Sequence, residues 1–511
     1  MSIPRSRPFF SCLLVLLASM LLAPLAWATD YRVGPGQPLA AIADVPWATL
    51  APGDRVFIHW RAEPYREKWV INRRGTAAEP IEIRGVRGPG GERPVIDGRD
   101  ATTPAGLNFW NEQRGVIKIG GSNTPPDDLP AHLLVEGLEI RSGRPPFTFT
   151  DDGGSTQTYS TNAASIYVEK AEFLTIRDCA LHDSGNGLFV GAFNGATQDL
   201  LIEGSELFDN GIVGSIFEHN SYTEAVGITY QWNRFSALRA GAGGNNLKDR
   251  SAGLVVRYNW IEDGNRQLDL VDGGPDVAGA VGYGETFVYG NVLLESDGQG
   301  NSQIVHYGGD GGDPSDYRKG LLHFFHNTVV STRSGNTTLL RLSTQDESAE
   351  VRNNVLYVAA EGQRLAMLDA AGALMLRNNW SKPGWRASHG TLTGTIDDDA
   401  SGVTGSAPGF LDEVGQNFRP AGDSPLRDAG GSLAAPGHPL QLHYVKHLRS
   451  EDRPDDGMLD IGAYEFCRDA CDALFADGFE SGGTGAWSQI VPLTSRPMAA
   501  GSSSPTEANS R

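Results

Sequence analysis

Short apolar runs, each interrupted by an asparagine or a small residue, recur along the middle of the chain. The copies are LTIRDCAL, LIEGSEL, ITYQWNRF, VVRYNWI, FVYGNVLL, HFFHNTVV, EVRNNVLY and LMLRNNW. The interrupting positions are Cys179, Ser205, Asn233, Asn259, Asn291, Asn327, Asn354 and Asn379. Units this short cannot bury a core alone, so they must stack on one another. The pattern predicts an all-β chain folded as a single-stranded parallel β-helix, which is a solenoid.

Asparagine suits a sharp bend between such runs. It tolerates left-handed backbone, and its amide can bond to the asparagine of the next coil. We therefore expect the repeated asparagines to be structural. Cys179, in an apolar coil position, is expected to be an inert core residue.

Three polar stretches in consecutive repeats interrupt this apolar pattern: 219–222 (HNSY), 246–250 (NLKDR) and 267–269 (QLD). If each belongs to a strand of one sheet, alternation with period two sends one set of side chains out of the same face. That set is Tyr222, Lys248, Arg250 and Asp269. We expect the substrate-binding residues to be Asn220, Asn246, Gln267 and Asp269. The prediction depends on register, because a slip of one residue turns every member inward.

Both ends of the chain differ from the repeats. Arg5 and Arg7 precede an apolar run that ends in Ala26-Trp27-Ala28, which predicts a signal peptide over 1–28 cleaved after Ala28. A membrane anchor is the alternative, but Pro24 and the small residues favour cleavage, and no later stretch is apolar enough to span a bilayer. We expect a secreted protein, periplasmic or extracellular.

The remaining chain is predicted to form one β-helix domain over 29–466, with Leu39–Leu50 as a short helix in its N-terminal cap. After Trp380 the repeat fades, and we expect a C-terminal closing segment whose last strand covers the final coil. An appendage over 467–511, partly disordered on composition, is expected to follow. Cys467 and Cys471 could close a disulfide loop within it. The formal charge of −20 argues against nucleic acid as a partner, and we expect a monomer.

The order of elements near the N-terminus, a short helix, then LAPGDRV, PIEI and PVIDG, resembles that of pectate-lyase-like right-handed β-helix proteins. The central stretch is similar to exported bacterial right-handed β-helix proteins grouped as polysaccharide-degrading enzymes. The matching positions are His219, Asn220, Tyr222, Asn246, Lys248, Arg250, Tyr258, Asn259, Asp269, Gly290, Asn291, Tyr307, Gly308, His326, Asn327 and Val329. The resemblance implies a right-handed helix and a polysaccharide substrate.

The polar cluster has the residue types that β-elimination from an acidic polysaccharide requires. A cation must neutralise the uronate carboxylate, a base must remove the neighbouring proton, and an acid must protonate the leaving oxygen. We assign Lys248 as base, Arg250 as carboxylate clamp, and Tyr222 or His219 as proton donor. β-helix lyases with a lysine base and an arginine partner provide the analogy. The alternative is a surface ion-pair ladder without chemistry.

Other functions stay open. Asp269 and Asp272 are oxygen donors that suggest Ca²⁺ as a cofactor, although no calcium-loop motif is present. The same two carboxylates are candidates for a glycoside hydrolase. A solenoid that only binds carbohydrate would show an aromatic stripe on the outward face of the sheet, and none is evident between Asn186 and Tyr307. Trp110, Phe147, Phe149 and Tyr159 could line a sugar-stacking rim or pack locally, and His306 and His323 are expected to pack at coil surfaces.

Overall fold

The structure is a computed structural model that describes residues 28–433 and 437–467. The chain divides into two units, Met1–Phe466 and Cys467–Arg511, and the strands described below all belong to the first. The predicted signal peptide, residue Cys471 and nearly all of the predicted appendage lie outside the described residues. The Cys467–Cys471 disulfide therefore stays a prediction.

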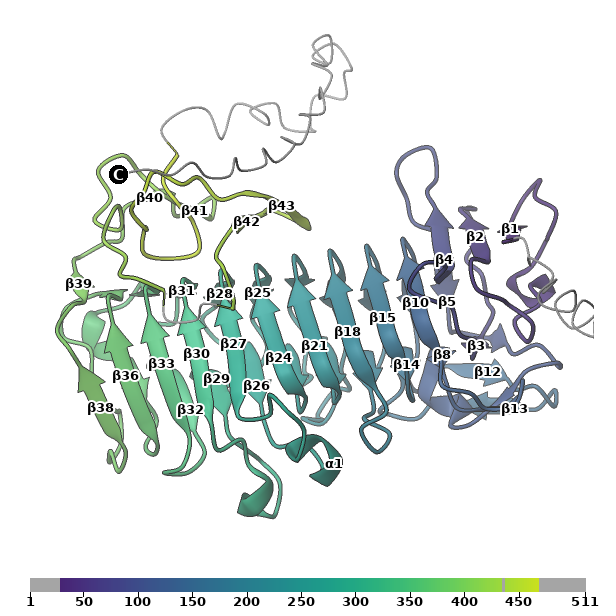
Figure 1. Ribbon diagram of the computed structural model, residues 1–511, viewed down its shortest axis with the longest axis horizontal. Coiled ribbons are helices and arrows are strands. Elements are labelled where there is room, and N and C mark those ends of the chain that lie inside the picture. The colour runs from purple at the N-terminus through teal and green to yellow at the C-terminus, as the bar shows by residue number, and fades with distance from the viewer. Residues whose placement is uncertain (1–27, 434–436, 468–511) are drawn as a thin grey trace, which may run out of the picture. The chain divides into compact units, whose positions relative to one another are not determined.

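Three long parallel sheets form most of this unit, and most turns of the chain contribute one strand to each of them (Figure 1). Within the described residues the first sheet contains β1 (Asp30–Val33), β2 (Arg55–His59), β4 (Ile81–Val86), β10 (Ala131–Glu136), β15 (Glu172–Arg177), β18 (Gln198–Glu203), β21 (Val226–Gln231), β24 (Ala252–Arg257), β27 (Glu285–Tyr289), β30 (Leu321–Phe325), β33 (Ser348–Arg352), β36 (Ala373–Arg377) and β38 (Thr395–Asp398). The predicted parallel β-helix is thus confirmed.

From β4 onward, each strand of the first sheet is followed along the chain by a strand of the second sheet. It contains β5 (Val95–Asp97), β11 (Glu139–Arg141), β16 (Ala180–His182), β19 (Glu206–Phe208), β22 (Arg234–Phe235), β25 (Trp260–Glu262), β28 (Val292–Glu295), β31 (Thr328–Ser331), β34 (Val355–Val358), β37 (Trp380–Ser381) and β39 (Val403–Thr404).

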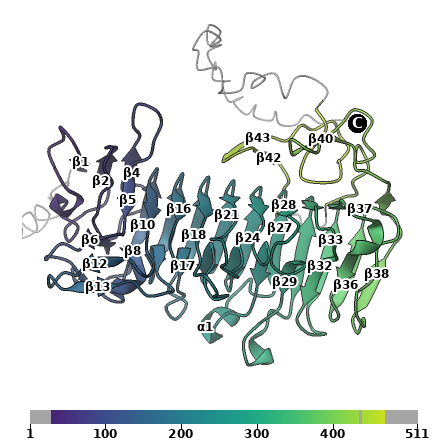
Figure 2. The same cartoon turned by 180° about the vertical axis from the view of Figure 1, so that it is seen from behind.

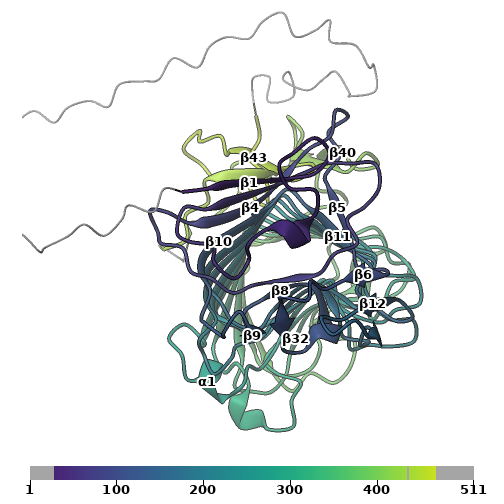
Figure 3. The same cartoon turned by 90° about the vertical axis from the view of Figure 1, so that its right-hand side faces the viewer.

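The third sheet completes each coil. It contains β3 (Trp69–Ile71), β8 (Gly115–Ile119), β14 (Ala164–Val168), β17 (Asn186–Val190), β20 (Ser221–Thr223), β23 (Leu247–Asp249), β26 (Leu268–Leu270), β29 (Gln303–Tyr307), β32 (Thr337–Leu342) and β35 (Leu365–Leu368). Viewed along the stack, the three sheets enclose one interior (Figure 3). Alternate residues of their strands fill it with apolar side chains, most of them aliphatic.

The asparagine ladder lies at the bend between the first and second sheets. The amide Nδ2 of Asn259 donates to Oδ1 of Asn291 at 3.0 Å, and Asn291 donates to Asn327 at 2.9 Å. The expected coil-to-coil bonds are confirmed. The left-handed residue is not the asparagine, however, but the residue before it, such as Tyr258 (φ 53°) or His326 (φ 49°). That residue makes the turn, and the asparagine bonds across it.

Short elements connect and cap the coils. The predicted helix over Leu39–Leu50 is wrong, because only the 3-10 turn Ile42–Asp44 forms there. Other 3-10 turns are Glu112–Arg114, Pro314–Asp316 and Gly362–Arg364, and α1 is Pro275–Ala278. In Figure 1 and in the reverse view of Figure 2, the segment with α1 projects from the same edge of the stack.

The small sheets lie outside the coils. They are formed by β6 (Ala101–Thr102) with β12 (Thr148–Thr150) and β13 (Thr156–Thr158), β7 (Asn108–Phe109) with β9 (Ser122–Thr124), β40 (Phe410–Asp412) with β41 (Asn417–Pro420), and β42 (Leu442–Val445) with β43 (Arg449–Asp452).

The C-terminal segment of this unit does not cover the final coil as expected. In Figure 1 it lies along the strands of the second sheet. Trp260 on the outer face of that sheet stacks on Phe418, with ring centroids 5.7 Å apart, and on Tyr444 at 6.0 Å. Trp260, Val292, Val355 and Trp380 are buried there. The second sheet is therefore closed to ligands along these coils.

Candidate functional site

One row of outward side chains runs down the third sheet, and we call it the wall. Strand pairing places Tyr167 beside Phe189, Phe189 beside Tyr222, Tyr222 beside Lys248, Lys248 beside Asp269, Asp269 beside His306, and His306 beside Arg341. The expected register of Tyr222, Lys248 and Asp269 is confirmed. Adjacent strands lie about 4.8 Å apart, so neighbouring members can contact one ligand.

Lys248 sits between two carboxylates. Its Nζ donates to Oδ2 of Asp269 at 2.7 Å and to Oδ2 of Asp310 at 2.5 Å. The side chain of Lys248 is 7% exposed, whereas that of Asp310 is 36% exposed. The side-chain nitrogen of Lys248 is thus held between one buried and one partly exposed carboxylate.

Arg250 bonds to both Tyr222 and Asp310. Its Nε donates to the Tyr222 hydroxyl at 2.9 Å, and its Nη2 donates to Oδ1 of Asp310 at 2.7 Å. Its Nη1 donates to the Asp272 carbonyl. Burial works to lower the pKa of Arg250, but the Tyr222 hydroxyl and Asp310 outweigh it and raise the pKa. The two oxygens of Asp310 thus bridge Lys248 and Arg250.

Asp269 is the most tightly held carboxylate of the wall. Oδ2 accepts from Lys248 and from Asn245 Nδ2 at 2.8 Å, while Oδ1 lies 2.8 Å from His306 Nδ1. Burial favours the protonated acid, but the bond to His306 and the charge of Lys248 outweigh it and hold the pKa of Asp269 well below its usual range. Asp269 is therefore ionised and closed to new ligands.

His219 does not suit the predicted role of proton donor. It is 2% exposed, and its Nδ1 accepts a hydrogen bond from the Asn245 backbone N–H at 2.9 Å. Burial, aided by the charge of Lys248, lowers the pKa of His219 to about 3. The imidazole is neutral near pH 7 and orients the wall by packing edge-on to Tyr222, with ring centroids 5.5 Å apart.

The predicted substrate-binding residues Asn220, Asn246 and Gln267 face the interior instead. Asn220 Nδ2 donates to Asn246 Oδ1 at 2.6 Å, and Asn246 Nδ2 donates to the carbonyl of Glu262 at 2.8 Å. These two form a second asparagine ladder, and both are fully buried. Each lies one residue before its strand begins, where the period-two alternation of a strand does not yet apply, so its side chain turns inward.

Gln267 is likewise buried, with Nε2 donating to Oε2 of Glu295 at 2.6 Å and to the carbonyl of Leu294 at 2.9 Å. It therefore makes internal bonds and has no polar group directed at the wall. Of the predicted substrate-binding residues, Asp269 is the one that lies on the wall.

The residues do not fit the calcium site considered from the sequence. The oxygens of Asp269 already bind an ammonium, an amide and an imidazole. Oδ1 of Asp272 accepts the backbone N–H groups of Asp310 and Gly311 and lies 3.5 Å from Arg250 Nη1. A cation would meet positive charge on both sides. Among the residues that the structure describes, no cluster of three or more His, Cys, Asp or Glu is suited to a metal ion.

Sequence reasoning missed Asp310, which comes from the loop after β29 and reaches the wall only through the fold. It also missed an aromatic stripe, because Tyr167, Phe189 and Tyr222 lie in one outward row with ring centroids 5.1 and 5.4 Å apart. Aligning the second-to-last residue of each third-sheet strand would have revealed the stripe. His306 does lie at a coil surface, as expected, but it bonds to Asp269.

The four aromatic residues considered for a sugar-binding rim differ in burial. Phe149 and Tyr159 are buried, each 2% exposed, with Lys68 Nζ lying 3.9 and 4.4 Å from their ring centroids. For these two the local-packing alternative holds. Trp110 and Phe147 remain partly exposed.

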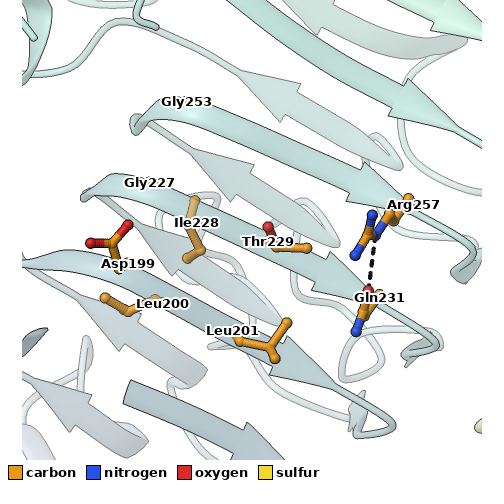
Figure 4. Close-up of a pocket in the computed structure, with 9 residues that line it drawn as sticks. All are labelled: Asp199, Leu200, Leu201, Gly227, Ile228, Thr229, Gln231, Gly253 and Arg257. Carbon is orange, nitrogen blue, oxygen red and sulfur yellow. Dashed lines mark hydrogen bonds between the residues drawn. The ribbon is translucent and has the colours of Figure 1, made fainter. Parts of the chain in front are cut away.

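A separate hollow of about 420 Å³ lies on the outer face of the first sheet, across β18, β21 and β24 (Figure 4). Gly227 and Gly253 leave it open, and Arg257 Nε donates to Gln231 Oε1 at 2.9 Å along its side. Leucine and isoleucine side chains line much of the rest. It has no pair of opposed acid and base groups, so the wall is the stronger candidate for chemistry.

Comparison with known proteins gives similarity of fold only. No protein-family model matches the chain, and no curated protein matches it. Its backbone is similar to pectate lyase Pel9A (TM-score 0.47, 13% identity, 86% of this chain and 98% of that chain). It is also similar to an alginate lyase from Paenibacillus sp. str. FPU-7 (TM-score 0.41, 14% identity, 64% and 91%) and to a rhamnogalacturonan lyase (TM-score 0.37, 12% identity, 75% and 91%). None of the helices in the described residues is long and apolar enough to cross a membrane.

Proposed function

We propose that this chain is a secreted, monomeric enzyme that cleaves an acidic, uronate-containing polysaccharide by β-elimination at the wall. The observation that carries the proposal is the bridge made by Asp310. One oxygen of its carboxylate contacts Lys248 at 2.5 Å and the other contacts Arg250 at 2.7 Å. A uronate carboxylate that displaced the half-exposed Asp310 would find the same two cations at the same spacing.

The contacts of Lys248 change the roles assigned from the sequence. Lys248 and Arg250 together hold the uronate carboxylate and stabilise the charge that develops when the neighbouring proton leaves. Tyr222 is then the proton-transfer group, because Arg250 Nε lies 2.9 Å from its hydroxyl and would stabilise a phenolate. As the phenolate, Tyr222 takes the proton from the sugar carbon, and the phenol that forms donates it to the leaving oxygen. Phe189, next in the row, offers a ring face for a neighbouring sugar.

A hydrolase is the second candidate, since Asp269 and Asp310 both contact the Lys248 ammonium. Their oxygens therefore lie within about 5 Å of each other, which is close to the carboxylate spacing of retaining glycosidases. The burial of Asp269 and its bonds to Lys248, Asn245 and His306 count against it. Asp272, proposed from the sequence as the partner, is engaged by backbone N–H groups.

The test is a panel of alginate, pectate, glucuronan, glycosaminoglycans and neutral glucans, followed by ultraviolet absorbance of unsaturated uronates and by reducing ends. We expect both signals on one acidic polymer, and both lost in Arg250→Ala. Reducing ends without the absorbance would favour the hydrolase. Silence in both, with polymer retained on the protein, would leave a binding solenoid that uses the aromatic stripe.

A further inference from the structure

Three side chains from successive coils of the wall form a hydrogen-bonded chain that elimination does not use. Asp269 Oδ1 lies 2.8 Å from His306 Nδ1, and His306 Nε2 lies 2.9 Å from Ser343 Oγ. Asp269 belongs to β26, His306 to β29, and Ser343 directly follows β32. The carboxylate, imidazole and hydroxyl thus occupy the relative positions of an acid–base–nucleophile triad.

The charge states suit proton transfer from the serine. The ionised Asp269 accepts from Nδ1–H of His306, so Nε2 carries a lone pair that faces Ser343 Oγ. Burial lowers the pKa of His306 although Asp269 opposes the shift, which keeps the imidazole neutral and able to accept a proton. Lys248 and Asn245 fix the other oxygen of Asp269 and so orient the chain of bonds.

Ser343 is also held in place and is partly exposed. Its Oγ accepts the backbone N–H of Gly309 at 2.8 Å, and its own proton can point to His306 or to the carbonyls of Gly309 (2.9 Å) and Tyr307 (3.4 Å). Arg341, two residues earlier on the same face, makes no ion pair or side-chain hydrogen bond with the described part of the chain. Arg341 therefore lies in the same outward row as His306, with a partly exposed side chain that has no such partner in the described residues.

We propose that Ser343, His306 and Asp269 form an acyl-hydrolase site that removes an ester-linked acyl group, such as acetyl, from a sugar hydroxyl. Oγ of Ser343 bonds to the ester carbonyl carbon, its proton passes to His306 Nε2, and Arg341 faces the oxyanion. The C–O bond to the sugar breaks, and the sugar oxygen takes the proton from His306. Water then hydrolyses the acyl-enzyme in the same way, which releases the carboxylic acid and restores Ser343.

This inference does not depend on elimination, because the two reactions give different products. Ester hydrolysis releases acetate without cutting the polymer, whereas elimination on a de-esterified polymer yields unsaturated ends. Failure of one therefore says nothing about the other.

The experiment treats the purified protein with a fluorophosphonate probe, p-nitrophenyl acetate and an O-acetylated polyuronate. We expect one probe adduct on the peptide that contains Ser343, and acetate release that falls by about a hundredfold or more in Ser343→Ala and His306→Gln. Ser348→Ala is the matched control, since Ser348 Oγ bonds to the Gly320 carbonyl at 2.9 Å, and it should keep full activity. Thermal unfolding by circular dichroism checks each fold.

A second variant covers the case in which His306→Gln unfolds. Ser343→Cys should react with iodoacetamide faster than a free thiol, because His306 would accept its proton. Three results would overturn the proposal: no adduct on Ser343, acetate release that persists in folded Ser343→Ala, or a thiol in the Ser343→Cys variant that reacts no faster than a free thiol.

Discussion

At the scale of single residues, the wall shows how neighbours decide a role that residue type leaves open. Lysine and tyrosine can both transfer protons, and the difference lies in what they contact. Two carboxylates surround the ammonium of Lys248, whereas a guanidinium lies 2.9 Å from the hydroxyl of Tyr222. In the proposed function, these contacts assign Lys248 to the carboxylate clamp and Tyr222 to proton transfer.

Replacement of Lys248 separates these roles. If Lys248 holds the carboxylate, Lys248→Arg keeps a positive charge and should retain about a tenth of kcat/KM or more, while Tyr222→Phe should lose about a hundredfold or more in kcat with KM little changed. Steady-state kinetics on the polymer identified by the panel measures both. Complete loss in Lys248→Arg alongside an active Tyr222→Phe would return the base to Lys248.

The buried His219 should lower the free energy of unfolding as the pH falls. Its pKa is about 3 in the fold and about 6.5 when unfolded, so the unfolded chain binds the extra proton first. The stability that it contributes is complete above pH 6.5 and is lost as pH falls from 6.5 toward 3. Between pH 7 and pH 5 the loss is on the order of 2 kcal/mol. Urea unfolding should show a smaller loss over this range in His219→Gln than in the parent, and equal slopes would contradict the assignment.

At the scale of elements, the ladder asparagines fix the bend that brings the second and third sheets into place. Asn291 accepts from the backbone N–H and the amide of Asn259, and donates to Asn327 and to the carbonyl of Val256 at 2.9 Å. All of these groups are buried, so loss of one amide leaves several polar atoms without partners.

Asn291→Ala should therefore destabilise the protein by on the order of 3 kcal/mol. The comparison is Asn336→Ala on the surface, where Oδ1 accepts from Arg364 at 3.1 Å and the expected cost is below about 0.5 kcal/mol. The denaturant midpoints of the two variants measure these two losses of stability. Equal costs would mean that the ladder contributes no more than a surface contact.

The loop between β29 and β30 is predicted to compete with substrate. Asp310 occupies the carboxylate position of the proposed clamp, so Asp310→Ala should lower the Kd for an acidic oligosaccharide several-fold and leave elimination active. Asp313→Ala in the same loop, where the carboxylate bonds to Ser315, is the control. Calorimetric binding together with the absorbance assay gives both quantities. Abolished cleavage in Asp310→Ala would instead support a hydrolase that needs this carboxylate.

At the scale of the whole unit, the C-terminal segment and the coils stabilise each other through the second sheet. Trp260 is 1% exposed between β25 and that segment. Coils in a solenoid contact mainly their neighbours, so a segment that spans several coils couples their unfolding.

Trp260→Ala should cost about 3–5 kcal/mol and should weaken the cooperativity of unfolding. The control is Trp110→Ala, which should destabilise the protein far less. Trp110 is partly exposed and stacks on Phe193 with ring centroids 6.3 Å apart. Circular dichroism and tyrosine fluorescence followed through one urea titration test this. Coincident transitions of unchanged steepness would show that the segment is not coupled to the coils.

The repeat by itself determined the parallel β-helix, the coil-to-coil asparagine bonds and the register of Tyr222, Lys248 and Asp269, because period-two alternation and a recurring bend are local properties of the chain. Alternation failed at Asn220, Asn246 and Gln267, which lie just before their strands and turn inward. Only the tertiary structure brought Asp310 to the clamp, Ser343 to His306 and the C-terminal segment to the second sheet. Each of these contacts joins residues far apart in the sequence, and a loop's path is set by packing and charge pairing that no local pattern encodes.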